Sequence, residues 1–388
     1  MRLLLINDTN ETGGAESHFW DSVKLLREKH DVATLTFGSS EVLEGRDLVI
    51  KESPNSHQRK LQGFLTSVTI RKKIKKIINQ LKPEIIHVHN VHKYPSAILG
   101  ALKGRKVVHT IHDYGYVCPT SWSVVQGSLK ICPAGYGMKC LQCLSFPEWI
   151  GQGIYHPKKA RLLKNAVSVS VCPSKKLLEY MQRHGFPNPV YVPHFADTKK
   201  WFPEKVERDP KLLLYVGGLT AQKGVSFLIK AMPEILKKEA LLEVAGEGKQ
   251  KQELLDLVDE LRLGNHVKFI GRLSDDELRL KYSSVACLVI PSVWMEQFGL
   301  VGAEALLCGC PVVGSEIGGI PDWLKEGETG LLARRADSRS LAEAVLKVLE
   351  NPTFAKRLSD NGKEFIRKEF SKEQWLMKIE KIYLSLAS

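Results

Sequence analysis

The sequence PSVWMEQFGLVGAEAL at residues 291–306 directly follows the apolar run Val285–Ile290, and it decides the fold. A short, continuously apolar run is typical of a parallel strand buried on both faces. Residues Val301–Leu307 then have the apolar pattern of a helix. Two acids, Glu296 and Glu304, lie in this segment with seven residues between them. The segment therefore predicts a ligand-binding loop between a buried strand and a helix.

The rest of the chain repeats this alternation of apolar runs with amphipathic stretches. The runs expected to form strands are Leu3–Ile6, Val32–Phe37, Ile85–Val88, Val107–Ile111, Val167–Val171, Val190–Val192, Leu212–Val216, Leu241–Ala245, Val267–Ile270, Val285–Ile290 and Pro311–Gly314. The stretches expected to form helices are Ala15–Glu28, Ser174–His184, Val225–Lys237, Gln250–Leu261, Asp275–Tyr282, Val301–Leu307 and Lys372–Leu386. Strands that alternate with helices indicate parallel sheets covered on both faces. The predicted fold class is α/β, with two Rossmann-like doubly wound domains.

The chain of 388 residues is long enough for two domains, each with its own core. A charged stretch with several prolines and little apolar periodicity, residues 194–210, marks the junction. We therefore expect domains at 1–196 and 197–370, with an insertion at 114–147 in the first. A final helix is expected at 371–388.

The formal net charge is +13, and all of it lies in the first domain. Residues 1–196 hold 27 Lys and Arg against 14 Asp and Glu, whereas the remainder holds 29 against 29. A one-sided basic surface suggests an anionic partner, such as lipid head groups, nucleic acid or a phosphorylated substrate. The alternative is a basic surface without such a partner. Nucleic acid is not expected, because no reading motif and no aromatic–basic interleaving is evident.

One basic stretch, residues 58–82, combines eight Lys and Arg with apolar residues at helical spacing. The spaced apolar residues are Ile70, Ile74, Ile77, Ile78 and Leu81. Such a helix suits the interface of an anionic leaflet; the equal alternative is a surface helix packed on its own domain. No apolar run approaches the roughly 18 residues of a membrane span, and Met1–Ile6 is too short for a signal peptide. We expect a cytoplasmic protein, with peripheral contact at the inner face of the membrane as a hypothesis.

Two glycine loops each follow a predicted strand and open a helix. The loop TGGAE contains Gly13 and Gly14, and the loop GGLTAQKG begins at Gly217 and contains Lys223. Glycines let the backbone approach a ligand, and a helix N-terminus presents unpaired N–H groups that suit a phosphate. The alternative is a plain tight turn. Neither loop has the GxGxxG spacing of a dinucleotide site.

Histidines gather near the end of a predicted buried strand in the first domain. The sequence HTIHD at His109–Asp113 places His112 where it can bond a sugar hydroxyl or a leaving phosphate. His87, His89 and His92, on the preceding strand and loop, compete for the same role. The alternative for each is a structural histidine with satisfied hydrogen bonds.

The two acids of residues 291–306 have a more specific interpretation. A carboxylate accepts two hydrogen bonds and can hold the vicinal hydroxyls of a ribose, and the helix dipole favours an acid such as Glu304 in its first turns. The Gln297–Leu300 backbone adds N–H groups. Two acids at this spacing also suit a hydrolase pair, but the glycine-rich phosphate loops argue against a hydrolase.

In this order, the four motifs resemble those of glycosyltransferase family 4, of the GT-B architecture, over essentially the whole chain. The specific part is the pair of acids around QFGL, followed by CPVV at 310–313 and GGIP at 318–321. The resemblance implies two domains that face each other across a cleft. The first would bind the acceptor and the second the nucleotide, and the C-terminal helix would return to the first domain.

The resemblance also implies a role for each matching residue. His112 would lie by the reacting sugar, and Glu296 would meet the donor sugar and diphosphate; these two are the expected catalytic residues. The expected donor-binding residues are Gly13, Gly14, Gly217, Lys223, Arg272, Gln297, Phe298, Gly299, Leu300 and Glu304. Glu304 would hold the ribose. The family often has Arg where this chain has Gly218, and Arg272 is expected to replace that phosphate cation.

The activity implied is a retaining, hexosyltransferase-type transfer from a nucleotide-diphosphate sugar to a glycan or lipid-linked acceptor. The setting would be polysaccharide or glycolipid biosynthesis, and catalysis would need no metal. Two alternatives stay open: a sugar-nucleotide epimerase of the same fold, and a catalytically silent scaffold that binds a nucleotide sugar. Dependence on an acceptor separates the first alternative from the transferase.

Four of the eight cysteines cluster in the insertion that follows His112. They are Cys118, Cys132, Cys140 and Cys143. In a cytosolic protein such clustering suggests a metal more than a disulfide. Four thiolates suit a closed structural zinc site, and an iron–sulfur cluster is less favoured. Reduced thiols without metal are the alternative.

Overall fold

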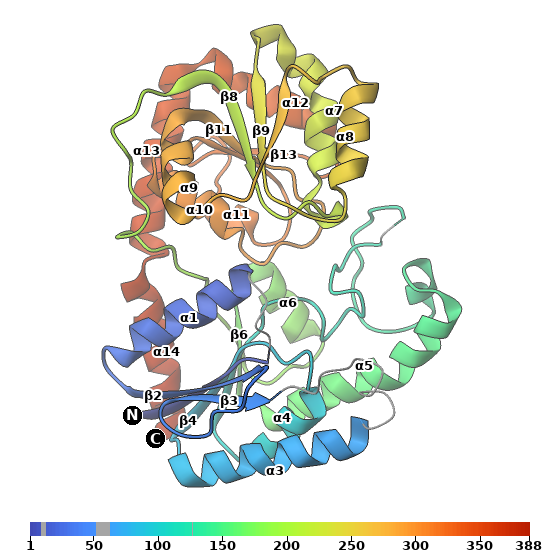
Figure 1. Ribbon diagram of the computed structural model, residues 1–388, viewed down its shortest axis with the longest axis vertical. Coiled ribbons are helices and arrows are strands. Elements are labelled where there is room, and N and C mark those ends of the chain that lie inside the picture. Colours follow the sequence, from blue (N-terminus) through green and yellow to red (C-terminus); the bar gives the residue numbers. More distant parts are fainter. Residues whose placement is uncertain (9–12, 52–62, 126) are drawn as a thin grey trace. The chain divides into compact units, whose positions relative to one another are not determined.

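The computed structural model describes residues 1–8, 13–51, 63–125 and 127–388, with side chains of residues 63–66 left undescribed (Figure 1). Part of the first glycine loop and residues 58–62 of the basic stretch therefore lie outside the described residues. The chain forms two compact units. Unit 1 comprises Met1–Gly127, Cys132–Pro193 and Trp375–Ser388, and unit 2 comprises Ser128–Ile131 and His194–Gln374.

Unit 1 contains a seven-stranded sheet in the order β3-β2-β1-β4-β5-β6-β7, and every ladder between these strands is parallel. The strands are β1 (Arg2–Ile6), β2 (Asp31–Gly38), β3 (Asp47–Lys51), β4 (Ile85–Val88), β5 (Val107–Thr110), β6 (Val169–Cys172) and β7 (Pro189–Tyr191). The central strands are buried throughout, as the continuous apolar runs predict. The strand order reverses between β1 and β4, and ligands of open α/β sheets bind at such a switch point.

The helices of unit 1 include the C-terminal helix. They are α1 (Gly14–Arg27), α3 (Gly63–Leu81), α4 (Pro95–Leu102), η1 (Met138–Gln142), α5 (Phe146–Ala166), α6 (Lys175–Arg183) and α14 (Lys372–Ala387). The hydroxyl of Tyr383 in α14 lies 2.6 Å from Nδ1 of His87 in β4. The Trp375 ring packs edge-on against His18 of α1, with 5.6 Å between centroids. The predicted return of the C-terminal helix to the first domain is confirmed.

Unit 2 contains a six-stranded parallel sheet in the order β10-β9-β8-β11-β12-β13. The strands are β8 (Asp209–Val216), β9 (Leu241–Ala245), β10 (Val267–Gly271), β11 (Val285–Ile290), β12 (Val312–Ser315) and β13 (Leu331–Ala333). Each unit thus has the doubly wound order of a Rossmann-like domain, and the α/β prediction is confirmed. The switch point of unit 2 lies between β8 and β11.

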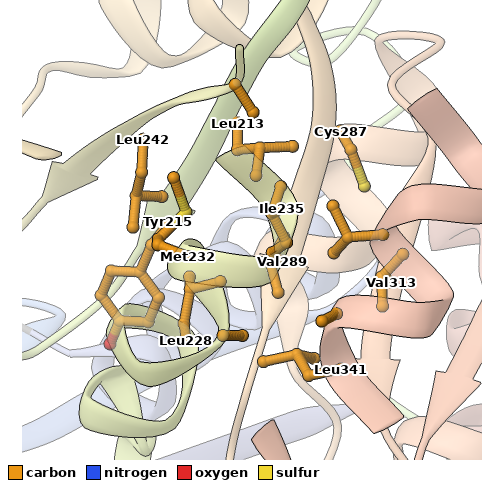
Figure 2. Close-up of a cluster of buried hydrophobic side chains, with 14 of the residues drawn as sticks. Leu213, Tyr215, Leu228, Met232, Ile235, Leu242, Cys287, Val289, Val313 and Leu341 are labelled. Atoms are coloured by element: carbon orange, nitrogen blue, oxygen red, sulfur yellow. The ribbon is translucent and has the colours of Figure 1, made fainter. Parts of the chain in front are cut away.

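Helices complete unit 2 around one apolar core. They are η2 (Ala221–Lys223), α7 (Val225–Ile235), η3 (Leu236–Lys238), α8 (Lys251–Glu260), α9 (Asp275–Ser284), α10 (Leu300–Leu307), α11 (Ile320–Trp323), α12 (Ser338–Glu350) and α13 (Pro352–Glu369). Figure 2 shows the strand residues Val289 and Val313 facing Met232 of α7 and Leu341 of α12. This core fixes the strands, and the loops at their carboxyl ends are positioned by it.

Helix α3 corrects one expectation. Ile70, Ile74, Ile77 and Ile78 are at most 4% exposed, so its apolar face packs inside unit 1. That face is unavailable for insertion into a leaflet, and the alternative of a helix packed on its own domain holds. None of the described helices is both long and apolar enough to cross a membrane.

Candidate functional site

In unit 2, four loops meet at the carboxyl edge of the sheet, around its switch point. Backbone hydrogen bonds tie the loops together. Gly217 N–H donates to Ala245 O at 3.0 Å, and Gly246 N–H donates to Gly271 O at 2.7 Å. Val293 N–H, after β11, donates to Gln222 O at 2.9 Å. The loop predicted after β8 and the loop predicted after β11 are thereby held side by side.

Three glycines allow these loops to approach closely. A Cβ on Gly246 would lie 1.8 Å from Gly217 O, and a Cβ on Gly224 would lie 2.0 Å from Pro291 O. A Cβ on Gly248 would lie 2.3 Å from Leu219 O. No other residue fits at these positions without moving the backbone. The sequence interpretation missed Gly246 and Gly248, although a Gly-x-Gly pair directly after an apolar run was the available signal.

Lys223 and Glu296 form the polar centre of these loops. Lys223 Nζ lies 2.6 Å from Glu296 Oε1, which also accepts from Ser292 Oγ at 2.7 Å. Glu296 is 5% exposed, and burial alone would raise its pKa. The charge and hydrogen bond of Lys223 outweigh burial and hold the pKa of Glu296 below its ordinary value. Lys223 is held at this position by the ion pair, and its side chain is 32% exposed.

The backbone around Glu296 is clamped by the GGIP motif. Gly319 N–H donates to Glu296 O at 2.7 Å, and Gly318, at φ +61°, would place a Cβ 2.2 Å from the same oxygen. This clamp gives the family-like GGIP motif a structural role, since a side chain on Gly318 would push Glu296 out of place.

The neighbouring predicted donor residues have different surroundings. Phe298 is 1% exposed, and its carbonyl accepts from Trp323 Nε1 at 2.6 Å, so its side chain belongs to the core. Gln297 is 6% exposed; its Nε2 donates to Met295 O, while its buried Oε1 has no partner among the described atoms. Gly299, at φ +82°, is the N-cap of α10, which begins at Leu300.

Two further predicted residues lie at the same edge of unit 2. Glu304 is one turn into α10 and half-buried. Arg272 follows β10 directly and is exposed. Gly218 has ordinary room, because a Cβ there would meet only Glu247 O, at 4.0 Å. The departure from the family's Arg is therefore not forced by lack of space.

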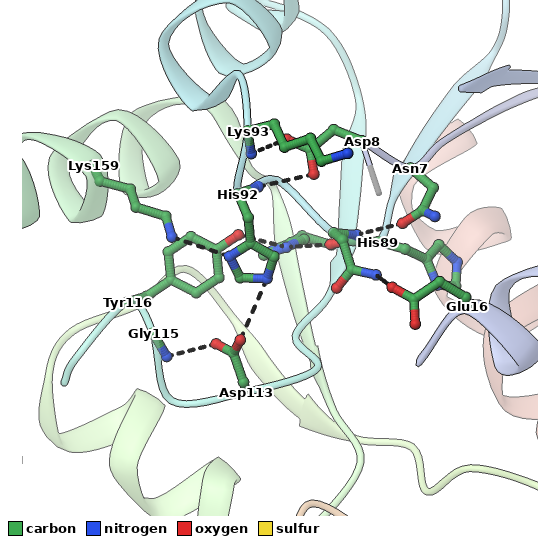
Figure 3. A network of polar contacts seen from close by, with 12 residues as sticks. Asn7, Asp8, Glu16, His89, His92, Lys93, Asp113, Gly115, Tyr116 and Lys159 are labelled. Atoms are coloured by element: carbon green, nitrogen blue, oxygen red, sulfur yellow. Dashed lines mark hydrogen bonds and ion pairs between the residues drawn. The ribbon is translucent and has the colours of Figure 1, made fainter. Parts of the chain in front are cut away.

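In unit 1, a network of buried polar side chains occupies the equivalent switch point (Figure 3). Asp8, directly after β1, accepts backbone N–H groups of His92, Lys93 and Tyr94 at 2.7–3.0 Å. Burial raises the pKa of Asp8, although these three N–H groups act in the opposite direction. The carboxyl group shapes the loop after β4, and the sequence interpretation did not single it out.

His112 lies in this network beside His89. Its Nε2 is 3.0 Å from His89 Nδ1, and the two rings stack with 5.2 Å between centroids. His89 is 1% exposed, and burial holds its pKa well below the ordinary value, so it is neutral at pH 7. Of the competing histidines, His89 contacts His112 directly.

A second group in the network comes from three separate elements. His92 Nε2 lies 3.3 Å from Asp113 Oδ2, and Lys159 Nζ of α5 lies 3.4 Å from His92 Nδ1. Lys159 is 7% exposed, and its ammonium lies 4.5 Å from the Tyr116 ring centre. Burial lowers the pKa of Lys159, while Asp113 and Asp8 partly restore it. No sequence signal marks Lys159, because it is one of several lysines in its helix.

His87 and His109 form buried hydrogen bonds within unit 1. His87 lies between Tyr383 and Thr110, with its Nε2 2.8 Å from Thr110 Oγ1, and burial lowers its pKa to about 3. His109 Nε2 donates to His89 O at 2.9 Å.

Gly13 is the N-cap of α1, and Gly14 is its first residue. The helix end expected to meet a phosphate is therefore present.

The four clustered cysteines lie close together in the insertion without forming a ready metal site. Burial raises the pKa of Cys140, and the nearby Cys118 and Cys132 raise it further. All four thiols are free. Among the described residues, no three His, Cys, Asp or Glu side chains are arranged to hold a metal. A zinc or iron–sulfur site stays a prediction, which elemental analysis of untagged protein would test.

Comparison with known families accounts for nearly all of the chain. The family described as "Glycosyl transferases group 1" matches residues 197–365, and "Glycosyltransferase Family 4" matches residues 12–200. The chain is 28% identical over 377 residues to the uncharacterized glycosyltransferase MJ1178 of Methanocaldococcus jannaschii, covering 97% of this chain and 95% of that protein.

Solved structures share the fold. The sucrose-phosphate synthase of Thermosynechococcus elongatus has a TM-score of 0.77 at 22% identity, over 99% of this chain and 98% of its own. The Anabaena protein Alr3699/HepE, solved in complex with UDP-glucose, has a TM-score of 0.75 at 18% identity, over 99% and 100% of the two chains. At these sequence identities, the similarity to the solved structures shows the fold alone.

Proposed function

We propose a function from the premise that the chain belongs to the glycosyltransferases of group 1 and family 4, with the GT-B architecture. It transfers a sugar from a nucleoside diphosphate donor to a glycan or lipid-linked acceptor, and the configuration of the sugar is retained. The supporting observation is the Lys223–Glu296 pair, at 2.6 Å, among glycine loops at a switch point. Such loops offer unpaired backbone N–H groups and a fixed cation, which suit a diphosphate. The UDP-glucose complex of the Anabaena protein agrees with a nucleotide sugar as donor.

In the proposed mechanism, the Gly217 loop and Lys223 hold the diphosphate and Glu304 holds the ribose. As the bond from the anomeric carbon to the diphosphate breaks, negative charge grows on the leaving oxygen. Lys223 stabilises this charge, because its ammonium is held in place before the reaction. The leaving oxygen takes the proton of the attacking hydroxyl, which bonds to the same face of the sugar. Glu296 orients the Lys223 ammonium through their ion pair, and Arg272 adds a second cation.

For the acceptor, we propose the loops of unit 1 that contain His112, His92 and Asp113. The side chains of His92 and Asp113 are 33% and 21% exposed, so hydroxyl groups can reach them. An imidazole ring can donate or accept hydrogen bonds and a carboxylate accepts them, and both do so in defined directions, as recognition of a sugar needs. The family resemblance further assigns the helix N-terminus at Gly13 and Gly14 to the diphosphate and His112 to the reacting sugar, and we keep both assignments as part of the proposal.

The test is a thermal-shift screen of UDP-, GDP- and ADP-sugars, combined with nucleotide release with and without glycan or lipid-linked acceptors. We expect a shift with one donor class and release that depends on an acceptor and is lost in Glu304→Ala. Release without acceptor, with the sugar inverted at one carbon, would instead indicate an epimerase. No shift with any donor would indicate a scaffold without transferase activity.

A further inference from the structure

The outer face of α5 in unit 1 is apolar and uncovered. Phe146, Ile150 and Ile154, four residues apart, are 62%, 49% and 74% exposed. Residues at this spacing form one stripe along a helix. Just before α5, the short helix η1 adds Met138 at 68% and Leu141 at 36% exposed. A contiguous patch of exposed apolar side chains of this size indicates a surface that binds another protein or a membrane.

The stripe is held rigidly rather than on a loose loop. Ser145 and Glu148 form a capping box at the start of α5. On the inner face, Trp149 Nε1 donates to Gly137 O at 3.0 Å, and the Tyr136 ring stacks on Trp149 with 6.1 Å between centroids. The cysteine-containing insertion thus supports the helix from within while the stripe stays outside.

A basic groove lies beside this stripe. It has a volume of about 650 Å³ and is lined by residues of α3, α4 and α5, which follow one another in space in Figure 1. Arg71 of α3, Lys103 at the C-cap of α4 and Lys158 of α5 line it, over apolar residues that include Leu99 and Leu162. No acidic side chain is among the described residues that line it. An anionic group with an apolar neighbour fits these walls.

Stripe and groove form one surface, because Lys158 follows Ile154 by one helical turn and lines the groove. The charge around them is one-sided: apart from the buried Lys159, residues 132–166 contain four Lys and Arg against a single acid, Glu148. That acid is engaged by Ser145, whose backbone N–H and hydroxyl both donate to it. The surface is therefore cationic along its apolar face.

We propose that this α3–α5 surface docks unit 1 on an anionic lipid bilayer. Phe146, Ile150 and Ile154 enter the interface, and the Arg71–Lys103–Lys158 groove takes a lipid phosphate. Interfacial binding needs this combination of apolar side chains and clustered cations. The proposal differs from the interfacial helix expected from the sequence: α3 contributes cations, whereas the inserting face belongs to α5. It does not depend on the donor or on the transfer reaction.

The experiment is co-sedimentation of the full chain with vesicles of phosphatidylcholine, alone or with about 30% phosphatidylglycerol. We expect binding only to the anionic vesicles, weakened by high salt. Ile150→Ser with Ile154→Ser should lower the partition coefficient about 100-fold. Lys103→Glu with Lys158→Glu should lower it roughly 30-fold.

Two matched controls change the same chemistry elsewhere in unit 1. Met377→Ser with Leu384→Ser removes apolar residues that are 57% and 61% exposed in α14. Lys24→Glu with Lys381→Glu makes the same charge change on α1 and α14. Both controls should bind like the parent chain, and every variant should keep the parent thermal shift with a donor sugar.

Three outcomes would overturn the proposal. The first is that the chain binds neutral and anionic vesicles equally well, or binds neither. The second is that the control variants lose as much vesicle binding as the test variants. The third is a self-associated chain that becomes monomeric in the isoleucine variant, since a second copy would then cover the stripe. Loss of donor binding without loss of vesicle binding would instead count against the proposed transferase alone.

Discussion

The first six strands of unit 1 have the same order as the six strands of unit 2. The loops at the two switch points, however, contain different chemical groups. In unit 2 the loops consist of glycine backbone around one ion pair, Lys223 with Glu296. In unit 1 they hold stacked and hydrogen-bonded side chains, among them His89, His112 and the buried Lys159. Gly224, Gly246 and Gly248 of unit 2 leave no room for a Cβ, whereas each contact of the unit 1 network has a side chain as at least one partner.

This difference teaches what each switch point can recognise. Backbone N–H groups and a fixed cation recognise charge and shape, which suits an invariant group such as a diphosphate. A side-chain network with fixed tautomers recognises a particular pattern of hydroxyl groups and changes with each substitution. We therefore expect changes in unit 2 to affect every donor alike, and changes in unit 1 to affect particular acceptors.

The largest effect is expected from Gly246→Ala. The added Cβ would lie 1.8 Å from Gly217 O, at φ +148°, so the loops after β8 and β9 must separate. We expect a loss of about 3–5 kcal/mol in the unfolding free energy of unit 2 and no donor-induced thermal shift. Urea unfolding and the donor screen measure both.

Gly264→Ala is the control for this change. Nothing lies within 4 Å of its Cβ position, and its φ is not positive, so stability should change by less than about 0.5 kcal/mol. If Gly246→Ala were equally harmless, the donor loops would not depend on close backbone approach, and the contrast between the units would fail.

The fold could be predicted from the sequence wherever strands are long and buried. Ten of the expected runs between Leu3 and Ile290 coincide with strands, and most of these are the buried inner strands in which continuous apolar residues fit a parallel sheet; β7 and β10 are edge strands. Two edge strands were missed. Strand β3 has only Leu48 and Ile50 buried among its five residues, and β13 has three residues in all. Such short elements are stabilised by their neighbours rather than by their own pattern.

The site could be predicted only in part, because its contacts join distant residues. The resemblance identified Lys223 and Glu296, but their direct pairing depends on how two loops, 73 residues apart, are tied together. Lys159 has no distinguishing neighbours in the sequence, and only the fold brings it to His92. A helix was expected within residues 58–82, and α3 lies at Gly63–Leu81. What its apolar face contacts is decided by tertiary packing, which the sequence does not show.

The next largest effect is expected from Glu296→Gln, which keeps the shape and removes the charge that fixes Lys223. We expect kcat to fall about 100- to 1000-fold while donor binding falls much less, because the cation remains but is no longer aligned with the leaving group. Steady-state kinetics separate the two. Glu239→Gln, at an exposed pair with Lys211, is the control and should change neither. Equal losses of donor binding and kcat would mean that Glu296 only supports the fold.

Acid should distinguish the units through their buried histidines. In unit 1, burial lowers the pKa of His87 and His109 to about 3 and that of His156 to about 4. Burial also lowers the pKa of His89 well below 6.5. In unit 2, burial lowers the pKa of one histidine, His194, to about 3. These histidines stay neutral when folded but take a proton when unfolded, so stability is lost as pH falls below about 6.5. Each of these histidines lowers the free energy of unfolding by about 2 kcal/mol at pH 5. Unit 1 contains more of them, so it should lose more stability than unit 2.

Hydrogen exchange at pH 7 and pH 5, corrected for intrinsic exchange, measures this for each unit. Amides of β4 and β5 should lose more protection than those of β8 and β11. His87→Gln should reduce the pH dependence of unit 1, because glutamine keeps hydrogen-bonding capacity without titrating. Equal loss in both sheets would show that the histidine network does not set the acid sensitivity of unit 1.

The smallest effect is expected from Gly218→Arg, which adds the cation that the family resemblance implies at this position. The position has room, since the nearest atom to a Cβ is Glu247 O at 4.0 Å. An added guanidinium beside a diphosphate should tighten donor binding by about 1 kcal/mol, or roughly fivefold. Gly218→Ala adds the Cβ alone and should leave affinity unchanged. A gain limited to the Arg variant would mean that Arg272 does not already supply the second cation, whereas no gain would mean that the donor loops are complete with Gly218 as they stand.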